Sequence, residues 1–199
     1  MIRRLVTLVL AGGLALIMAV PAQAATVTTS IVSRTVGFDP AITKGAMGST
    51  FAWKNNDPTF THTSTQNIPL GLWDTGSIVP GITKSTVIAY AGSYAYHCNF
   101  HPTMTGTVKV PVIVSPASGT TSTTFTIKLA TKAPPSPYVY DVQKKVGSGA
   151  WANYRVGVTT ITVAFHPLAT GTFSFRSRLR NTSTAASSGY SPAKTITVS

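Results

Sequence analysis

The strongest constraint on the fold of this chain is a series of short segments rich in Val, Ile, Thr and aromatic residues, separated by turn-forming residues. Several of them alternate apolar and polar residues with a period of two, the pattern of a β-strand with one buried face. No segment keeps a helical period. Short strands at frequent intervals are typical of a sandwich or a barrel, so we predict an all-β fold. The clearest segments are 26–36, 85–90, 105–110, 123–129, 159–165 and 194–198.

The composition indicates a folded protein. Of the 199 residues, 43% are hydrophobic and 10% are charged, which is too apolar for a disordered polycation. The 16 Gly and 13 Pro residues lack the period of a fibrous chain. Two features are unusual: a formal net charge of +12, and a single cysteine, Cys98, which excludes an intramolecular disulfide.

The first 24 residues have the three parts of a secretory signal peptide. Arg3 and Arg4 supply the positive start, residues 5–20 are almost entirely apolar, and Ala22-Gln23-Ala24 is a small-x-small cleavage site. The apolar run is shorter than the ~20 residues of a typical membrane-spanning helix. We therefore expect cleavage before Ala25, export to the periplasm or the cell surface, and no membrane span in the mature protein.

The character of the sequence changes near Pro111. Pro111 and Pro116 flank a short apolar run, and a stretch rich in Ser, Gly and Thr follows it. We place a domain boundary here, which predicts a signal peptide at 1–24, a first domain at 25–111 and a second domain at 112–199. Each domain is long enough to form a modest core of its own.

One loop of the first domain contains three residues that can bind a metal. Cys98, His101 and Met104 follow one another at intervals of three, between two predicted strands. Two imidazoles, a thiolate and a weak thioether suit copper that cycles between Cu(I) and Cu(II). His62, 36 residues before Cys98, follows an Asn-Asn-Asp-Pro turn and is the natural candidate for the second imidazole. Zinc fits less well because Met is not among its usual ligands.

Each of these residue types has a simpler explanation when it occurs alone. A lone Cys or Met is most often a buried apolar residue. Here, three candidates share one loop, and the only thiol of a chain predicted to be exported lies where a metal would hold it as thiolate. The combination therefore favours a metal site.

On these residues the first domain resembles the cupredoxins, the small blue copper proteins, and among them the plastocyanin, pseudoazurin and amicyanin group. The Cys-x2-His-x2-Met spacing is similar to the short ligand loop of amicyanin. The resemblance covers most of residues 25–111 and implies a Greek-key β-sandwich with one type 1 copper bound by His62, Cys98, His101 and Met104. Its other segments are Phe38-Asp39-Pro40, Phe51-Ala52-Trp53-Lys54-Asn55-Asn56-Asp57, Trp73-Asp74-Thr75-Gly76-Ser77, Gly92-Ser93-Tyr94-Ala95-Tyr96-His97 and Thr105-Gly106.

The same resemblance implies how such a site works. Met104 takes the axial position and helps to tune the reduction potential, and backbone N–H groups beside Cys98, including that of Asn99, are candidate donors to the sulfur. In the family, the last histidine ligand lies at the surface inside an apolar patch through which electrons pass. A transient redox partner is therefore expected. The candidates for the patch around His101 are Phe100, Pro102, Pro69 and Leu70.

Three other residues bear on the site. Thr63 follows His62 where several family members have Asn, which leaves open the local hydrogen bonding behind His62. His97 is predicted to point away from Cys98 because side chains alternate along a strand. His166 precedes Pro167 at the end of a predicted strand, so we expect it in a turn and not at the metal.

The second domain has the pattern of another sandwich. In residues 171–181, Phe173, Phe175 and Leu179 fall on one face of a strand, and Arg176, Arg178 and Arg180 fall on the other. Residues 115–199 resemble a fibronectin type III or related immunoglobulin-like domain, on looser motifs than the copper set. Such a fold by itself implies no activity.

The charge is divided unevenly between the two domains. Residues 25–111 contain five Lys or Arg and three Asp, a net charge of +2, whereas residues 112–199 contain nine Lys or Arg and one Asp, a net charge of +8. A row of arginines can attract an anionic polymer of the cell envelope or an acidic partner, but a solvated strand face that only favours solubility is the preferred interpretation. Nucleic acid is not expected as a partner, because no binding module is recognisable.

Two functions remain open. The favoured one is an exported electron-transfer protein, and its rival is a protein that binds or delivers copper at the cell surface without a role in a redox chain. An adhesive protein with a vestigial copper fold is disfavoured because no ligand is missing. An enzyme is disfavoured because copper oxidases and reductases generally need further copper sites, and the sequence offers no second ligand cluster.

Overall fold

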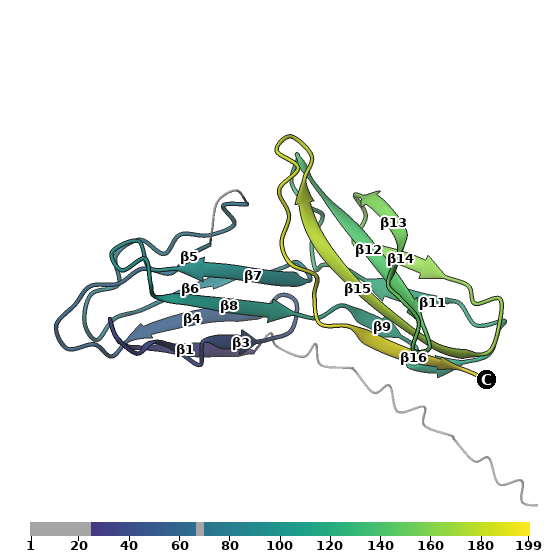
Figure 1. The fold of residues 1–199 in the computed structure, drawn as a ribbon, viewed down its shortest axis with the longest axis horizontal. Coiled ribbons are helices and arrows are strands. Elements are labelled where there is room, and N and C mark those ends of the chain that lie inside the picture. The colour runs from purple at the N-terminus through teal and green to yellow at the C-terminus, as the bar shows by residue number, and fades with distance from the viewer. Residues whose placement is uncertain (1–24, 67–69) are drawn as a thin grey trace, which may run out of the picture.

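The computed structural model describes residues 25–66 and 70–199, which form two β-sandwiches joined end to end (Figure 1). Across these ranges the chain forms strands and turns but no helix, as predicted. Accordingly, the described part of the chain has no helix long and apolar enough to cross a membrane. The predicted signal peptide lies outside the described residues.

The first sandwich consists of two four-stranded sheets, ordered β2-β1-β4-β6 and β3-β8-β7-β5. Two neighbouring pairs, β1 with β4 and β3 with β8, run parallel, and the others are antiparallel. The strands are β1 (Thr26–Ser33), β2 (Gly37–Asp39), β3 (Ile42–Lys44), β4 (Thr50–Asn55), β5 (Thr65–Gln66), β6 (Thr83–Val87), β7 (Gly92–His97) and β8 (Thr105–Val110).

The hairpin of β7 and β8 determines where the candidate ligand loop lies. Gly92 pairs with Val110 at the end next to the second sandwich, and His97 pairs with Thr105 at the opposite end. The loop of residues 98–104 therefore closes the hairpin at the far end of the molecule. Because each strand residue rises ~3.4 Å, this loop lies about 20 Å from the connection between the sandwiches.

The second sandwich packs a three-stranded sheet, β14-β11-β9, against a five-stranded sheet, β10-β16-β15-β12-β13. The predicted boundary at Pro111 falls in the short connection between β8 and β9. No sheet of the described chain contains strands from both sandwiches. The strands are β9 (Ile113–Ser115), β10 (Ser118–Gly119), β11 (Phe125–Lys128), β12 (Tyr138–Val146), β13 (Ala152–Val158), β14 (Thr162–Phe165), β15 (Gly171–Asn181) and β16 (Lys194–Val198).

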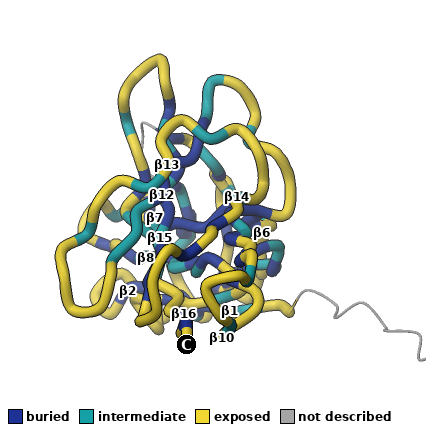
Figure 2. Tube along the Cα trace, turned by 90° about the vertical axis from the view of Figure 1, so that its right-hand side faces the viewer, coloured by how far each residue is buried: buried dark blue, intermediate teal, exposed yellow. Residues whose placement is uncertain are grey.

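The alternation predicted for residues 171–181 is confirmed on β15. Phe173, Phe175 and Leu179 are buried, whereas the three arginines between and after them are half-buried on the other face. Figure 2 shows the buried positions running through the middle of the chain trace, with the exposed ones in the surrounding loops.

The two sandwiches share a tight junction. The Ala91 N–H donates to Leu129 O at 2.8 Å, and the Thr131 N–H donates to Ala89 O at 2.9 Å. The rings of Tyr90 and Tyr140 lie 6.3 Å apart across the junction. Instead of the two separate cores that we expected, the buried apolar residues form one cluster that continues from the first sandwich into the second.

Candidate metal centre

Three of the four predicted ligands meet at the far end of the first sandwich. The ligand atoms of His62, Cys98 and His101 all lie within 4.8 Å of one another. Cys98 Sγ lies 3.8 Å from His62 Nδ1 and 3.6 Å from His101 Nδ1. His62 and Cys98 are fully buried and His101 is half-buried. The structure thus brings together residues that are 36 positions apart in the sequence.

The two sulfur–nitrogen separations fit a metal ion bound between Cys98 and each histidine. With metal–nitrogen and metal–sulfur bonds of about 2.1 and 2.3 Å, the two ligand atoms lie about 3.6 Å apart in a tetrahedral site and about 3.8 Å apart in a trigonal plane. The observed distances of 3.6 and 3.8 Å span this interval. One thiolate with two imidazoles is the donor set of a type 1 copper site.

The spacing of three residues between candidates corresponds to two successive tight turns. The His101 N–H donates to Cys98 O at 3.2 Å, and the Met104 N–H donates to His101 O at 2.8 Å. The Cys98 N–H then donates back to Met104 O at 3.0 Å, which closes the loop. The backbone therefore holds Cys98, His101 and Met104 at fixed positions around one small ring.

Met104 lies in the wall of this loop and is 3% exposed. A Cβ atom at Gly37, on the neighbouring strand β2, would lie 3.9 Å from Met104 Cγ, so the glycine leaves ordinary van der Waals room beside the thioether. Gly106 is required more strictly, because a Cβ there would overlap the ring of Tyr96. Gly106 therefore lets the ring of Tyr96 pack closely under the ligand loop, whereas a Cβ at Gly37 would make only an ordinary contact with Met104.

An ionised carboxylate orients His62. Asp57 Oδ1 accepts backbone hydrogen bonds from Thr59 at 2.9 Å and Phe60 at 3.0 Å, and Asp57 Oδ2 lies 3.2 Å from His62 Nε2. The hydrogen bond from Thr59, followed by those from Phe60 and His62, lowers the pKa of Asp57 to about 2 against the opposing effect of burial. A carboxylate accepts hydrogen bonds, so the His62 proton is on Nε2 and Nδ1 is free to face Cys98.

The side chain of Asn55 stabilises the turn that contains Asp57 and Phe60. It is fully buried, and its Nδ2 donates to Phe60 O and to Ile78 O, both at 2.8 Å. Its Oδ1 accepts from the Asp57 N–H at 2.9 Å. Sequence reasoning noticed the Asn-Asn-Asp-Pro turn but gave Asn55 and Asp57 no role. Their positions, seven and five residues before His62, were the available signal.

Thr63 joins the two ligand segments. Its N–H donates to Cys98 Sγ at 3.3 Å, and its Oγ1 accepts from the Asn99 N–H at 2.8 Å. The prediction that the Asn99 N–H donates to the sulfur was therefore wrong, because this N–H donates to Thr63 Oγ1 instead. The open question about Thr63 is answered: its hydroxyl links the His62 segment to the Cys98 loop.

An aromatic cluster closes the inner side of the site. The ring of Tyr96 packs against Phe38 at 4.7 Å and Trp53 at 5.5 Å, and Trp53 stacks on Trp73 at 5.8 Å. Burial raises the pKa of Tyr96 to about 12 and keeps its hydroxyl neutral. The site therefore has an apolar, rigid inner wall.

The outer side of the site is open at His101. Phe100 is 53% exposed and Pro102 is exposed, and the ring of Phe60 lies 6.0 Å from that of His101 in an edge-on arrangement. Burial, followed by electrostatic interaction with neighbouring His62 and Arg34, lowers the pKa of His101 and favours its neutral form, which can bind metal.

Two of the residues predicted for the patch around His101 are not seen there. Leu70 is 3% exposed, and its carbonyl accepts a hydrogen bond from the Tyr138 hydroxyl of the second sandwich, so it belongs to the junction. Its inclusion in the patch was wrong. Pro69 lies outside the described residues.

The remaining histidines are not part of the ligand group. His97 is half-buried on β7 and does not belong to the cluster of His62, Cys98 and His101. His166 follows β14, and its Nδ1 lies 3.2 Å from Thr124 Oγ1. Both agree with the sequence prediction that neither binds the metal.

No family model and no curated protein matches the chain, but solved structures do. A purple cupredoxin from Nitrosopumilus maritimus is 24% identical, with a TM-score of 0.37, over 43% of this chain and 98% of its own. An amicyanin variant in its reduced state is 26% identical, with a TM-score of 0.37, over 46% of this chain and 85% of its own. A copper-containing nitrite reductase from Thermus scotoductus is 22% identical, with a TM-score of 0.37, over 47% of this chain and 24% of its own. Each likeness covers less than half of this chain.

Proposed function

We propose that the protein is an exported electron carrier whose first sandwich is a cupredoxin domain. His62, Cys98 and His101 would hold one copper ion per chain, and Met104 would supply a weakly bound thioether. The observation that carries this proposal is the convergence of one sulfur and two imidazole nitrogens. The Nδ1 atoms of His101 and His62 lie 3.6 and 3.8 Å from Cys98 Sγ, and of the three residues only His101 is half-exposed. Copper bound there supplies a one-electron change between Cu(I) and Cu(II).

The chain's own contribution is to hold the ligands still. Asp57 fixes the ring of His62, Thr63 fixes the sulfur and the loop beside it, and the turns of residues 98–104 fix His101. Ligands held by a closed hydrogen-bond network move little when the charge at the site changes. Small movement favours fast electron exchange, which suits a carrier.

His101 provides the route to a partner. It is the only one of the three clustered ligands with exposed surface, and exposed Phe100 and Pro102 flank it in the sequence. We propose that a transient redox partner covers this small apolar end, since weak electron-transfer contacts are small. The half-buried Phe60, with Arg34 4.7 Å above its ring, forms one border of the patch.

Copper delivery is the rival function, and the half-buried His101 is the observation that favours it. A ligand at the surface is also the point through which an acceptor protein can remove the metal. We place electron transfer first because the network behind His62 and Cys98 is buried and closed, which opposes release. An enzyme is not proposed, since His62, Cys98 and His101 are the one cluster of three or more His, Cys, Asp or Glu residues found among the described residues.

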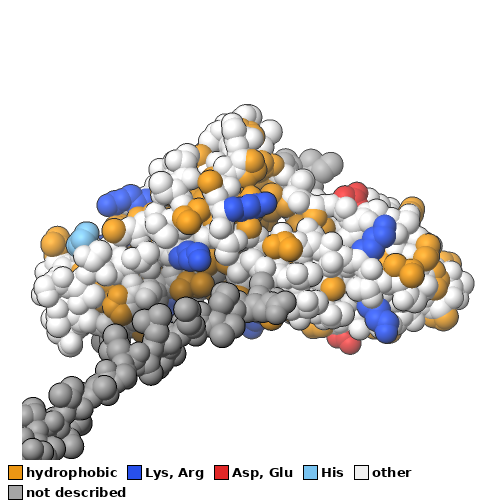
Figure 3. All heavy atoms as spheres, turned by 180° about the vertical axis from the view of Figure 1, so that it is seen from behind, with side chains coloured by type: hydrophobic (Ala, Val, Ile, Leu, Met, Phe, Trp, Pro, Cys, Tyr) orange, Lys and Arg blue, Asp and Glu red, His pale blue; other side chains and the backbone are white. Residues whose placement is uncertain are grey.

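The second sandwich is proposed to be an immunoglobulin-like or fibronectin type III-like domain, and its positive charge to attract an anionic polymer of the envelope. On the face shown in Figure 3, Lys and Arg side chains lie singly and do not gather in one patch. On β15, Arg178 and Arg180 both bind Asp141, at 3.1 and 2.8 Å. Any such binding is expected to weaken as the salt concentration rises.

Export is proposed from residues 1–24 and is tested by the mass of the protein recovered outside the cytoplasm. A mature chain that begins at Ala25 supports it. A chain that keeps Met1 in the cytoplasm contradicts it.

The test of the function is voltammetry of the copper-loaded full chain, followed by incubation with an apo-protein that binds copper tightly. We expect a reversible one-electron wave that survives repeated cycles while the copper stays bound. Stoichiometric transfer of copper to the acceptor, without a reversible wave, would establish delivery instead.

A further inference from the structure

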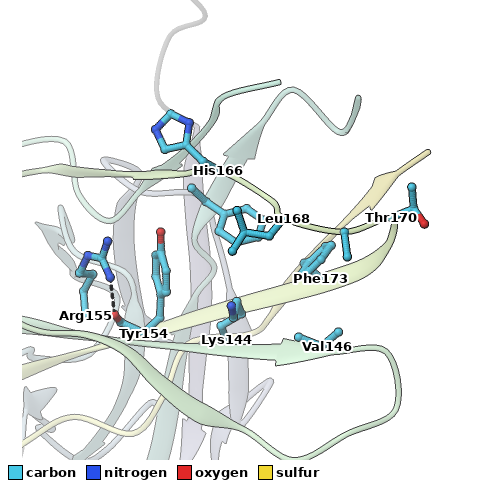
Figure 4. Close-up of a pocket in the computed structure, with 10 residues that line it drawn as sticks. Lys144, Val146, Tyr154, Arg155, His166, Leu168, Thr170 and Phe173 are labelled. Carbon is cyan, nitrogen blue, oxygen red and sulfur yellow. Dashed lines mark hydrogen bonds between the residues drawn. The ribbon is translucent and has the colours of Figure 1, made fainter. Parts of the chain in front are cut away.

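A hollow lies in the second sandwich, away from the proposed copper site. It has a volume of about 470 Å³ and is lined from β12, β13, the segment after β14, and the start of β15 (Figure 4). Lys144 and Val146 line it at the end of β12 opposite Tyr138, whose hydroxyl contacts Leu70 at the junction. Small-molecule sites in proteins occupy about 300–1,000 Å³, so this volume suits a ligand of modest size.

The walls of the hollow are mainly apolar. Tyr154, Phe165 and Phe173 form an aromatic side, with the ring of Phe165 5.7 Å from Tyr154 and 5.0 Å from Phe173. At the mouth, Leu168 is 98% exposed and Val146 is 52% exposed. Large apolar side chains held in water beside a hollow mark a binding surface more often than isolated ones do.

A cation points into this apolar space. Tyr140 and Val142 on β12 are fully buried, and Lys144 is the next residue on the same face. Its Nζ lies 5.5 Å from the centre of the Tyr154 ring and 5.3 Å from that of Phe165. Lys145, its neighbour, instead lies over Trp151 at 5.4 Å.

No acidic side chain balances the charge in the hollow. None of the residues that line it is Asp or Glu, and Arg155 lines it as a second permanent cation. Asp141 is the only acid in residues 112–199, and both Arg178 and Arg180 bind it. Arg155 uses one N–H on its neighbour's carbonyl, Tyr154 O, at 2.9 Å and has further donors available.

We propose that this hollow binds a small aromatic carboxylate. The carboxylate of the ligand pairs with the ammonium of Lys144, which lies over the rings of Tyr154 and Phe165, and the ring of the ligand packs against Val146 and Leu168 at the mouth. The apolar walls disfavour inorganic phosphate, and the ammonium of Lys144 already occupies the position over the rings that a cationic ligand would need. This site is separate from the copper centre, so it stands whether or not the protein carries electrons.

The test uses the copper-loaded full chain and two probes of one shape, naphthoate and its neutral analogue naphthylmethanol, titrated by calorimetry. We expect saturable binding of naphthoate at one site. Lys144→Gln should weaken naphthoate binding by about tenfold or more, because it removes a charge-assisted contact, and should leave naphthylmethanol within about twofold. Lys145→Gln is the matched control and should leave both probes within about twofold of the wild type.

A second variant, Leu168→Ser, tests the site without a risk of unfolding the protein, because Leu168 is 98% exposed and its replacement removes only surface contacts. Leu168→Ser should weaken both probes while leaving the circular dichroism spectrum unchanged. The proposal is overturned if naphthoate does not saturate, if naphthoate and naphthylmethanol bind equally, or if Lys144→Gln and Lys145→Gln have the same effect. It is also overturned if naphthoate binding disappears as the protein dimerises in sedimentation, which would assign the hollow to a second copy of the chain.

Discussion

Each sandwich buries a carboxylate, but the two differ in how far the partners of that carboxylate are exposed. In the first, Asn55 and His62 are fully buried and Asp57 is 3% exposed, and each has its hydrogen-bond partners within the fold. In the second, Asp141 is also 3% exposed, but its partners Arg178 and Arg180 lie on an outer sheet face, where their side chains are 32% and 24% exposed. Burial with full satisfaction fixes positions, as a metal site requires, whereas the outer network spreads charge over a surface.

The largest expected effect is at the thiol of the first sandwich. Cys98→Ser should abolish the intense visible absorption of the copper-loaded protein, because that band requires a thiolate bound to copper. Met104→Leu should keep the band and change the reduction potential, since the axial ligand tunes the potential. His166→Gln, in the second sandwich, is the control and should keep both. A Cys98→Ser protein that retains its colour contradicts the ligand assignment.

The next effect concerns the buried network. Asn55→Ala should reduce the free energy of unfolding by about 2–4 kcal/mol, because it leaves Phe60 O and the Asp57 N–H without a partner and leaves Ile78 O with only the His62 N–H. Urea unfolding of the metal-free chain measures it. Asn56→Ala, at an exposed neighbour, should change stability by less than about 0.5 kcal/mol. Equal decreases in the free energy of unfolding of Asn55→Ala and Asn56→Ala would show that the buried hydrogen bonds of Asn55 do not stabilise the fold.

In the second sandwich, Asp141→Asn should reduce the free energy of unfolding by less than Asn55→Ala does, about 1–3 kcal/mol at neutral pH. The reason is that the arginine partners of Asp141 are partly exposed to water. Burial opposes ionisation of Asp141, but hydrogen bonds from Arg180, Gly157 and Arg178 outweigh it and lower its pKa below 3.8. Its stabilising contribution is therefore complete above pH 3.8 and is lost as the pH falls through the lowered pKa.

The stability difference between the wild type and Asp141→Asn should accordingly narrow in acid. Urea midpoints measured at neutral pH and again well below pH 3.8 check this. A difference that stays constant between these two conditions would mean that the ionised carboxylate is not the stabilising form.

The smallest effect on the free energy of unfolding is expected from Arg176→Gln, about 0.5–1 kcal/mol. Its guanidinium stacks on Trp151 and Tyr190 and donates two hydrogen bonds to Gln143 Oε1, but these partners are neutral and the site is half-buried. The same variant should leave an anionic dextran sulfate column at slightly lower salt than the wild type. If it elutes at the same salt, Arg176 takes no part in binding the polymer.

The all-β fold class and the clustering of His62, Cys98 and His101 could be predicted from the sequence for a physical reason. Strand alternation and the spacing of Cys98, His101 and Met104 are local patterns, and the two turns that the spacing encodes are present. The strand predicted at 105–110 is found at those residues, whereas those predicted at 26–36 and 159–165 are shorter in the structure, Thr26–Ser33 and Thr162–Phe165. The ends of these strands lie in turns, which periodicity does not locate.

Other features depended on contacts that sequence patterns do not contain. The roles of Asp57 and Thr63 follow from which atoms face His62 and Cys98 across the sandwich. The placement of Leu70 at the junction follows from its contact with Tyr138, 68 positions away. Likewise, β13 was not predicted, because most of its residues are exposed and it has no clear alternation.

The central claim, a type 1 copper site at His62, Cys98 and His101, is tested most directly by titrating the metal-free full chain with Cu(II) and recording the visible spectrum. We predict an intense thiolate-to-copper band that saturates at one copper per chain and disappears on reduction. A correctly folded protein that binds copper without this band, or that shows no band at any copper ratio, would contradict the claim.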